Sequence, residues 1–127
     1  ISARQNYNYK VGLMAKGEGV YNTNCAGCHQ KDGTGMPPIF PAIKNSAIVN
    51  GDSVANISIV LHGKGGMPTF KMFDDENLAA VITYTRNAFG NTGSTVKPSD
   101  IKSARLNYNY HSLAESNTPT TVYITNM

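Results

Sequence analysis

The sequence predicts an all-α domain with irregular extensions at both ends. Apolar residues recur at spacings of three and four in residues 10–22, 52–61 and 74–89, which is the period of an amphipathic helix. Glycines and prolines lie between these stretches and mark loops. A chain of 127 residues is normally one domain. We therefore expect a single small helical domain.

Each expected helix has its own start or stop signal. In residues 10–22 the apolar stripe consists of Val11, Met14, Gly17, Val20 and Tyr21. The second helix begins at Asp52 or Ser53, either of which suits the capping position, and ends near Leu61. Asp74 caps the third helix, whose first-turn acids suit the positive end of the helix dipole, and Gly90 ends it.

The two ends of the chain do not share this pattern. We expect an N-terminal extension at 1–9, a domain at 10–102 and a C-terminal extension at 103–127. Residues 1–9 are polar and have no helical period. Residues 120–125, TTVYIT, form a candidate short β-strand.

An octapeptide recurs on either side of the domain. Residues 2–9 read SARQNYNY and residues 103–110 read SARLNYNY, so seven of eight positions match. One explanation of the repeat is chance similarity between two polar tails. The other is that both segments have the same role. The two segments would then pair with each other, bind neighbouring subunits, or join the units of a tandem array.

The composition indicates a small core and no nucleic-acid partner. The chain has four phenylalanines, seven tyrosines and no tryptophan, so its aromatic mass is low. Its formal net charge is +3, and its basic residues are scattered rather than clustered. No apolar run reaches the ~18–20 residues that span a bilayer. The chain begins at Ile1, so we expect either a mature product after signal removal or a piece of a longer polypeptide.

The most informative motif is Cys25-Ala26-Gly27-Cys28-His29, which reads C-x-x-C-H. This spacing is the attachment signature of a c-type haem, in which two thiols bond the vinyl groups and the histidine binds the iron. A thioredoxin-like redox pair normally lies in a βαβ setting, which the sequence before Cys25 lacks. A zinc site needs two further ligands, and His62 and His111 stand far apart. The motif predicts one covalent haem c, which would also supply an apolar centre for the core.

A second axial ligand must come from elsewhere in the chain. Thioether sulfur is the usual choice in electron carriers, and the candidates are Met14, Met36, Met67, Met72 and Met127. Met67 is preferred because it lies in the glycine-rich segment GKGGMP, whose backbone can approach a porphyrin edge and whose Pro68 stiffens the exit. Met72 is the second candidate. His62 is the nitrogen alternative and would give a bis-histidine site, unless it only serves the end of its helix.

Ligand histidines normally donate their other ring N–H to a backbone carbonyl. Pro38, in a rigid Pro-Pro turn nine residues beyond His29, is the expected acceptor. The alternative is that Pro38 only shapes the turn.

These residues resemble those of class I c-type cytochromes over about residues 12–102. The sequence is most similar to the cytochrome c domain of bacterial cytochrome c oxidase subunit II, in the segments LMAKGE, VYNTNC, PPIFPA and LAAVITYTRNAFGN. The resemblance implies three to four helices around one haem. It also implies that Gly17 and Tyr21 of the first helix cross Tyr84 of the last. The tails lie outside the family pattern, so the chain is either an excised oxidase domain or a free cytochrome, and the tails favour the free form.

The expected function is single-electron transfer between redox proteins, without substrate chemistry. Lys16, Lys31, Lys64 and Lys71 either steer an acidic partner or form an ordinary solvated surface. In a second hypothesis, residues 1–9 and 103–127 join neighbouring subunits by strand addition, which gives an electron-conducting assembly. A third is an enzyme or gas sensor with an open iron site. Because haem is attached to C-x-x-C-H, we expect the protein in the periplasm or at the cell surface. The sequence does not determine whether its redox partners are oxidases or dehydrogenases.

Overall fold

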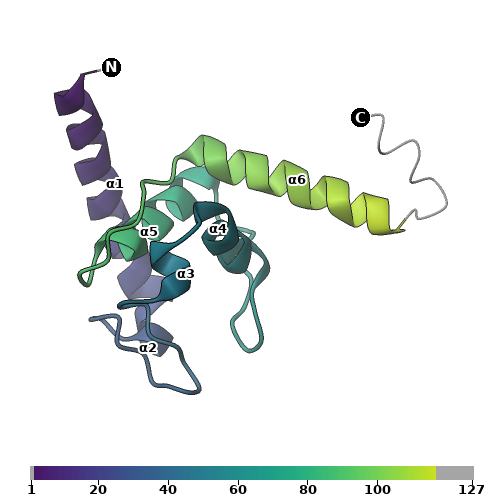
Figure 1. Ribbon diagram of the computed structural model, residues 1–127, viewed down its shortest axis with the longest axis horizontal. Helices are drawn as coiled ribbons and strands as arrows, with labels where there is room; N and C mark the ends of the chain where they lie inside the picture. Colours follow the sequence, from purple (N-terminus) through teal and green to yellow (C-terminus); the bar gives the residue numbers. More distant parts are fainter. Residues whose placement is uncertain (1, 117–127) are drawn as a thin grey trace.

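The computed structural model describes residues 2–116, with side chains described as far as residue 107. This part of the chain is helical and contains no named strand (Figure 1). Its elements are α1 (Ala3–Asn24), α2 (Ala26–His29), α3 (Ala47–Asn50), α4 (Ser53–His62), α5 (Asp75–Asn87) and α6 (Pro98–Ser116). The all-α prediction is confirmed. Over the described residues, no helix combines the length and the apolar character that crossing a membrane requires.

The main packing contact is the close crossing of α1 and α5. A Cβ atom added at Gly17 would lie 2.1 Å from the carbonyl oxygen of Ala80 and 2.6 Å from Cβ of Tyr84. Any side chain at Gly17 would therefore force the helices apart. One turn further along α1, the ring of Tyr21 lies 5.5 Å from the rings of Tyr84 and Phe89. The expected crossing of Gly17 and Tyr21 with Tyr84 is confirmed.

The predicted caps of α4 and α5 are also confirmed. The side chain of Asp52 accepts a hydrogen bond from the backbone of Val54 at 3.0 Å. The side chain of Asp74 accepts one from the backbone of Asn77 at 2.8 Å. Each cap satisfies a backbone donor that the first helical turn leaves free. Helix α5 ends before Gly90, where Phe89 and Gly90 both take positive φ angles of 58° and 82°.

The expectation of irregular extensions was wrong for residues 3–9 and 103–116. Helix α1 begins at Ala3 because Ser2 and Gln5 form a capping box: Gln5 N donates to Ser2 Oγ at 3.1 Å and Ser2 N donates to Gln5 Oε1 at 2.8 Å. The helical period is missing from residues 3–9 because all of them are exposed. The predicted domain boundaries fall inside helices, and the candidate strand at 120–125 lies outside the described residues.

A buried guanidinium ties α5 to the loops beside it. Arg86 is only 1% exposed, and its Nε donates to the carbonyl of Ser94 at 2.9 Å. Its Nη2 donates to the carbonyl of Gly51 at 2.8 Å, and its Nη1 to Oδ1 of Asn56 at 3.3 Å. Burial lowers the pKa of Arg86, although nearby Asp52 opposes that shift. Arg86 therefore holds the start of α4 and residue 94 against α5.

Asn91 plays a similar part for the loop that precedes α3. Its Nδ2 donates to the carbonyls of Ile43 at 3.0 Å and Thr85 at 2.8 Å. Its Oδ1 accepts from the backbone of Asn45 at 2.9 Å and from Nδ2 of Asn50 at 3.0 Å. One buried amide thus connects a long irregular segment to the end of α5.

We predict that Gly17→Ala lowers the free energy of unfolding by about 1–3 kcal/mol, because the new methyl overlaps the backbone of Ala80. Gly19→Ala is the matched control on the same helix, since a Cβ there meets no atom within 4 Å. Removing that exposed glycine from a helix interior should stabilise the protein by roughly 0.5–1 kcal/mol. Denaturant unfolding of both variants checks this, and equal stability of the two would contradict the close crossing.

Candidate haem site

The C-x-x-C-H motif forms one helical turn at the end of α1. Cys25 closes α1 by donating its backbone N–H to Tyr21 O at 2.8 Å, and the same residue starts α2. The backbone N–H of Cys28 and of His29 then donate to Cys25 O at 3.2 and 3.0 Å. Both thiols and the imidazole therefore project from a single turn, which is the arrangement that attachment to one porphyrin requires.

The two thiols of this turn differ in their surroundings. Cys25 is partly buried and packs against the hydrophobic core, whereas Cys28 is exposed. Burial, with a smaller contribution from Cys28, raises the pKa of the Cys25 thiol to about 11. Both cysteines are free, so no disulfide competes for them.

The imidazole of His29 is oriented by a backbone carbonyl. Its Nδ1 lies 2.8 Å from the carbonyl oxygen of Pro41. When Nδ1 donates to that oxygen, Nε2 carries the free lone pair and is the nitrogen available to a metal. This hydrogen bond fixes both the ring orientation and the tautomer that a haem ligand needs.

The expected acceptor, Pro38, was therefore the wrong proline. Met36 and Phe40 pair across a tight turn, with Met36 N to Phe40 O at 2.7 Å and Phe40 N to Met36 O at 2.9 Å. This pairing places Pro38 at an exposed tip and returns the chain to His29 at Pro41. The sequence indicated a proline-rich turn, but it carried no signal of which carbonyl would face the ring.

The far end of the motif is fixed by a buried phenol. Gln30 has a φ angle of 68°, and its carbonyl accepts a hydrogen bond from the hydroxyl of Tyr21 at 2.7 Å. Burial raises the pKa of Tyr21, so the phenol stays a neutral donor. The same residue that packs the α1–α5 crossing therefore also sets the position of the turn that carries His29.

Met67 lies in a short closed turn between α4 and α5. Its backbone N–H donates to Lys64 O at 2.9 Å, and Lys64 N donates back to Met67 O at 3.2 Å. Gly63, with a φ angle of 77°, is needed before this turn because a Cβ there would lie 2.6 Å from Met67 O. In Figure 1 this loop and α2 both lie toward the lower end of the view.

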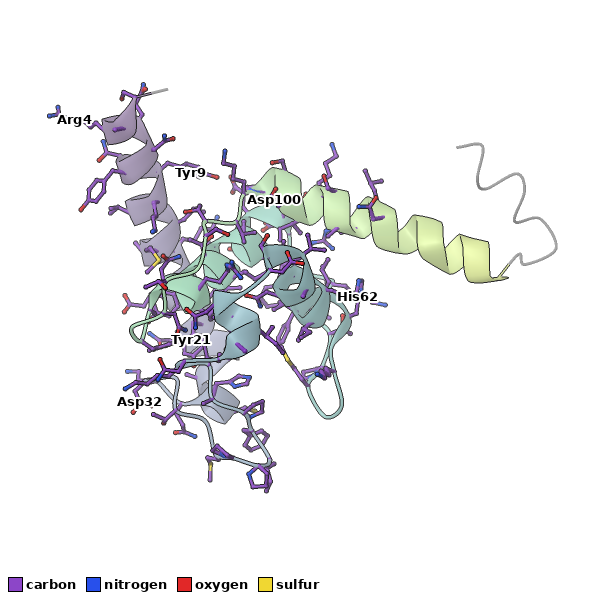
Figure 2. The ribbon with its side chains drawn as sticks, viewed as in Figure 1. Arg4, Tyr9, Tyr21, Asp32, His62 and Asp100 are labelled. Atoms are coloured by element: carbon purple, nitrogen blue, oxygen red, sulfur yellow. The ribbon has the colours of Figure 1, made fainter. Side chains whose placement is uncertain are left out.

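The other candidate ligands have different settings. Met67 is partly buried, whereas Met72 and Met36 are exposed, Met72 by 70%. Met14 is partly buried on α1, and Met127 lies outside the described residues. His62 is the last residue of α4, as expected (Figure 2). Burial, followed by nearby Lys71, lowers the pKa of its imidazole.

The apolar side chains near the motif fit a large apolar group. Met36, Ile39 and Phe40 follow His29 and are exposed by 56, 77 and 36%. The segment between α4 and α5, residues 63–74, is called the Met67 loop below. Cys25 of the motif and Phe70 of the Met67 loop both pack against the same hydrophobic core. Exposed apolar residues gathered on one loop are typical of a ligand-binding surface. Together with two free thiols and an oriented imidazole, these residues fit a covalent haem.

The four lysines that were expected either to steer an acidic partner or to form a solvated surface differ in their contacts. Lys16 forms an ion pair with Glu76 at 3.2 Å, across the α1–α5 contact. Lys31, which follows the motif, and Lys64 and Lys71 of the Met67 loop are exposed.

A sequence model of the family described as cytochrome c oxidase, cbb3-type, subunit III matches residues 12–84. The alcohol dehydrogenase (quinone) cytochrome c subunit of Gluconobacter oxydans is 33% identical over 110 residues, 76% of this chain and 23% of that protein. The cbb3-type oxidase subunit CcoP of an Azospirillum strain is 33% identical over 92 residues, 63% of this chain and 30% of that protein. Cytochrome c6 of Diacronema lutheri is 32% identical over 83 residues, 62% of this chain and 100% of that protein.

These similarities hold at the level of the family. This chain spans less than a third of the first two relatives but the whole of the cytochrome c6. The matching family model describes subunit III of a cbb3-type oxidase, so a closer relation to oxidase subunit II is not supported. The match covers more than half of the chain and includes the turn with Cys25, Cys28 and His29. The protein therefore belongs to the cytochrome c family, whose members carry a covalently attached haem c.

Proposed function

We propose that this protein carries single electrons between redox proteins through a haem c with His29 and Met67 as axial ligands. The observation that carries the proposal is the hydrogen bond from His29 Nδ1 to Pro41 O, on the same turn as both cysteines. It directs Nε2 to a metal, and the partly buried Met67 offers a sulfur from a separate closed turn. When bound, the haem supplies a single reversible oxidation of its iron.

The residues of the chain set the conditions for that electron. Cys25 and Cys28 hold the group covalently, so it stays bound in both oxidation states. The carbonyl of Pro41 holds the ring of His29 in one orientation. A thioether ligand favours ferrous iron and so raises the reduction potential. Because both ligands sit in turns closed by backbone hydrogen bonds, their positions change little between the two states.

The partners we propose are redox proteins with an acidic docking surface. Exposed Lys31, Lys64 and Lys71 lie on the two loops that flank the ligands, and the chain has a net charge of +3. Relatives described as subunits of an oxidase and of a quinone-dependent alcohol dehydrogenase support either direction of electron flow. If this chain is a domain of an oxidase subunit, it would carry single electrons in the same way. Attachment of haem to the motif supports a periplasmic or cell-surface location.

Replacing the proposed ligand should change the spectrum of the holoprotein. We predict that Met67→Ala abolishes the thioether-to-ferric charge-transfer band near the red end of the visible spectrum. It should also lower the reduction potential and allow rapid binding of carbon monoxide. Met72→Ala is the matched control, since that side chain is 70% exposed, and it should leave all three properties unchanged.

The same measurements decide between the alternatives. Loss of the band in Met72→Ala but not in Met67→Ala would transfer the ligand role to Met72. A wild-type protein without the band, binding carbon monoxide rapidly, would favour an enzyme or gas sensor with an open iron site.

A second proposal is that the terminal segments join subunits into an electron-conducting assembly. The observation that favours it is the placement of the repeated octapeptide on α1 and α6, the two helices that extend from the body of the domain (Figure 1). Tyr7 and Leu106 within these segments are 68 and 62% exposed, which suits burial against a neighbour. The contact would be made by helices rather than by strand addition, because residues 3–9 and 103–116 are helical.

We predict that deleting residues 2–9, or ending the chain after Arg105, lowers the number of subunits in the particle that the native source yields. Size-exclusion chromatography with light scattering measures this, and the haem spectrum of each truncated protein is the control for folding. If both truncated proteins keep the native size, the assembly proposal is wrong.

A further inference from the structure

We propose that Arg105 is a positioning residue for the haem ligand loop, and that α6 thereby helps to keep Met67 on the iron. This inference rests on the proposed function, in which Met67 is an axial ligand. It concerns a residue that lies beyond the family match at 12–84 and within the second copy of the octapeptide.

The guanidinium of Arg105 makes three contacts with the segment that follows Met67. Its Nη1 donates to Lys71 O at 2.6 Å, and its Nη2 donates to Phe73 O. Its Nε donates to Oδ1 of Asp75 at 2.8 Å, so the fork spans the end of the loop and the first residue of α5. The side chains of this ion pair are 27 and 35% exposed, which reduces screening by solvent.

The other end of the same segment is tied to α4. Thr69 Oγ1 donates to Leu61 O, and Phe70 N donates to Val60 O at 3.1 Å. Lys71 N in turn donates to Thr69 Oγ1 at 3.1 Å. The rings of Phe70 and Phe73 pack edge to face, 5.6 Å apart, and both lie against the core.

Met67 therefore has a closed turn on its N-terminal side and a doubly anchored segment on its C-terminal side. Moving the backbone of Met67 away from a ligand position would also move residues 68–73, which follow it directly. Arg105 resists that shift because two of its three acceptors are backbone carbonyls of this segment. A single planar fork reaches all three acceptors, which the compact ammonium of a lysine cannot do in one geometry.

An alternative is that Arg105 only fastens α6 to α5 through Asp75. Asp75→Asn separates the two roles, because it removes the ion pair while the carbonyl acceptors stay in place. The first copy of the repeat gives a matched control. Arg4 occupies the position equivalent to Arg105 and points away from the domain on the first turn of α1 (Figure 2).

The test measures how easily imidazole displaces the sulfur ligand from the ferric holoprotein. Binding is followed by loss of the charge-transfer band in wild type, Arg105→Gln, Arg105→Lys, Asp75→Asn and Arg4→Gln. We expect imidazole to bind about tenfold more tightly to Arg105→Gln, since the loop loses two backbone contacts. Arg105→Lys should recover part of this change. Asp75→Asn should have a smaller effect, and Arg4→Gln should equal wild type.

The outcomes separate this inference from the proposed function. A wild-type protein that lacks the charge-transfer band refutes Met67 ligation itself. If wild type has the band and Arg105→Gln binds imidazole as wild type does, the positioning role is refuted while Met67 ligation stands. An effect in Asp75→Asn as large as that in Arg105→Gln also refutes it, because the ion pair alone would then explain the change. If Arg105→Gln yields no folded holoprotein, the imidazole affinity of Arg105→Lys decides.

Discussion

The close crossing of α1 and α5 is the constraint on which the rest of the structure depends. Gly17 brings the two backbones together, and the rings of Tyr21, Tyr84 and Phe89 fill the space beside that contact. Because α2 follows α1 after a single residue, the crossing also places Cys25 and Ala26, at the start of the motif, against the core. Tyr21 completes this link, since its hydroxyl holds the carbonyl that ends the haem-attachment turn. The packing of α1 on α5 therefore also determines where the C-x-x-C-H turn lies.

Irregular loops carry much of the remaining site, and polar side chains hold them. Long segments without helix or sheet leave backbone groups that need partners. Asn91 makes three such contacts, with the backbone of Ile43, Asn45 and Thr85, and Arg86 makes others at the start of α4. Thr69 and Arg105 do the same for the loop that carries Met67. In these loops a few side chains therefore make the contacts that secondary structure would otherwise supply.

Local signals explain which features the sequence could predict. The C-x-x-C-H motif, the caps at Asp52 and Asp74, and the glycine at the helix crossing each depend on residues close together or on one steric requirement. The carbonyl of Pro41 could not be distinguished from that of Pro38, because the choice depends on how the turn between Met36 and Phe40 closes. The true start of α1 was missed because its first turns are polar and exposed, so only the capping box at Ser2 marks them.

The repeated octapeptide shows that two nearly identical segments can make different contacts in the same fold. Arg4 and Arg105 occupy the same position in nearly identical segments, and both segments are helical. Ser2 caps its helix and directly precedes Ala3, the first residue of α1, whereas Ser103 lies inside α6, five residues after Pro98, the first residue of that helix. That offset, together with the packing of α6 on α5, brings Arg105 against the loop before α5 and leaves Arg4 exposed. The copies share a helical preference, but only the surrounding fold gives the arginine of the second copy a role within its own subunit.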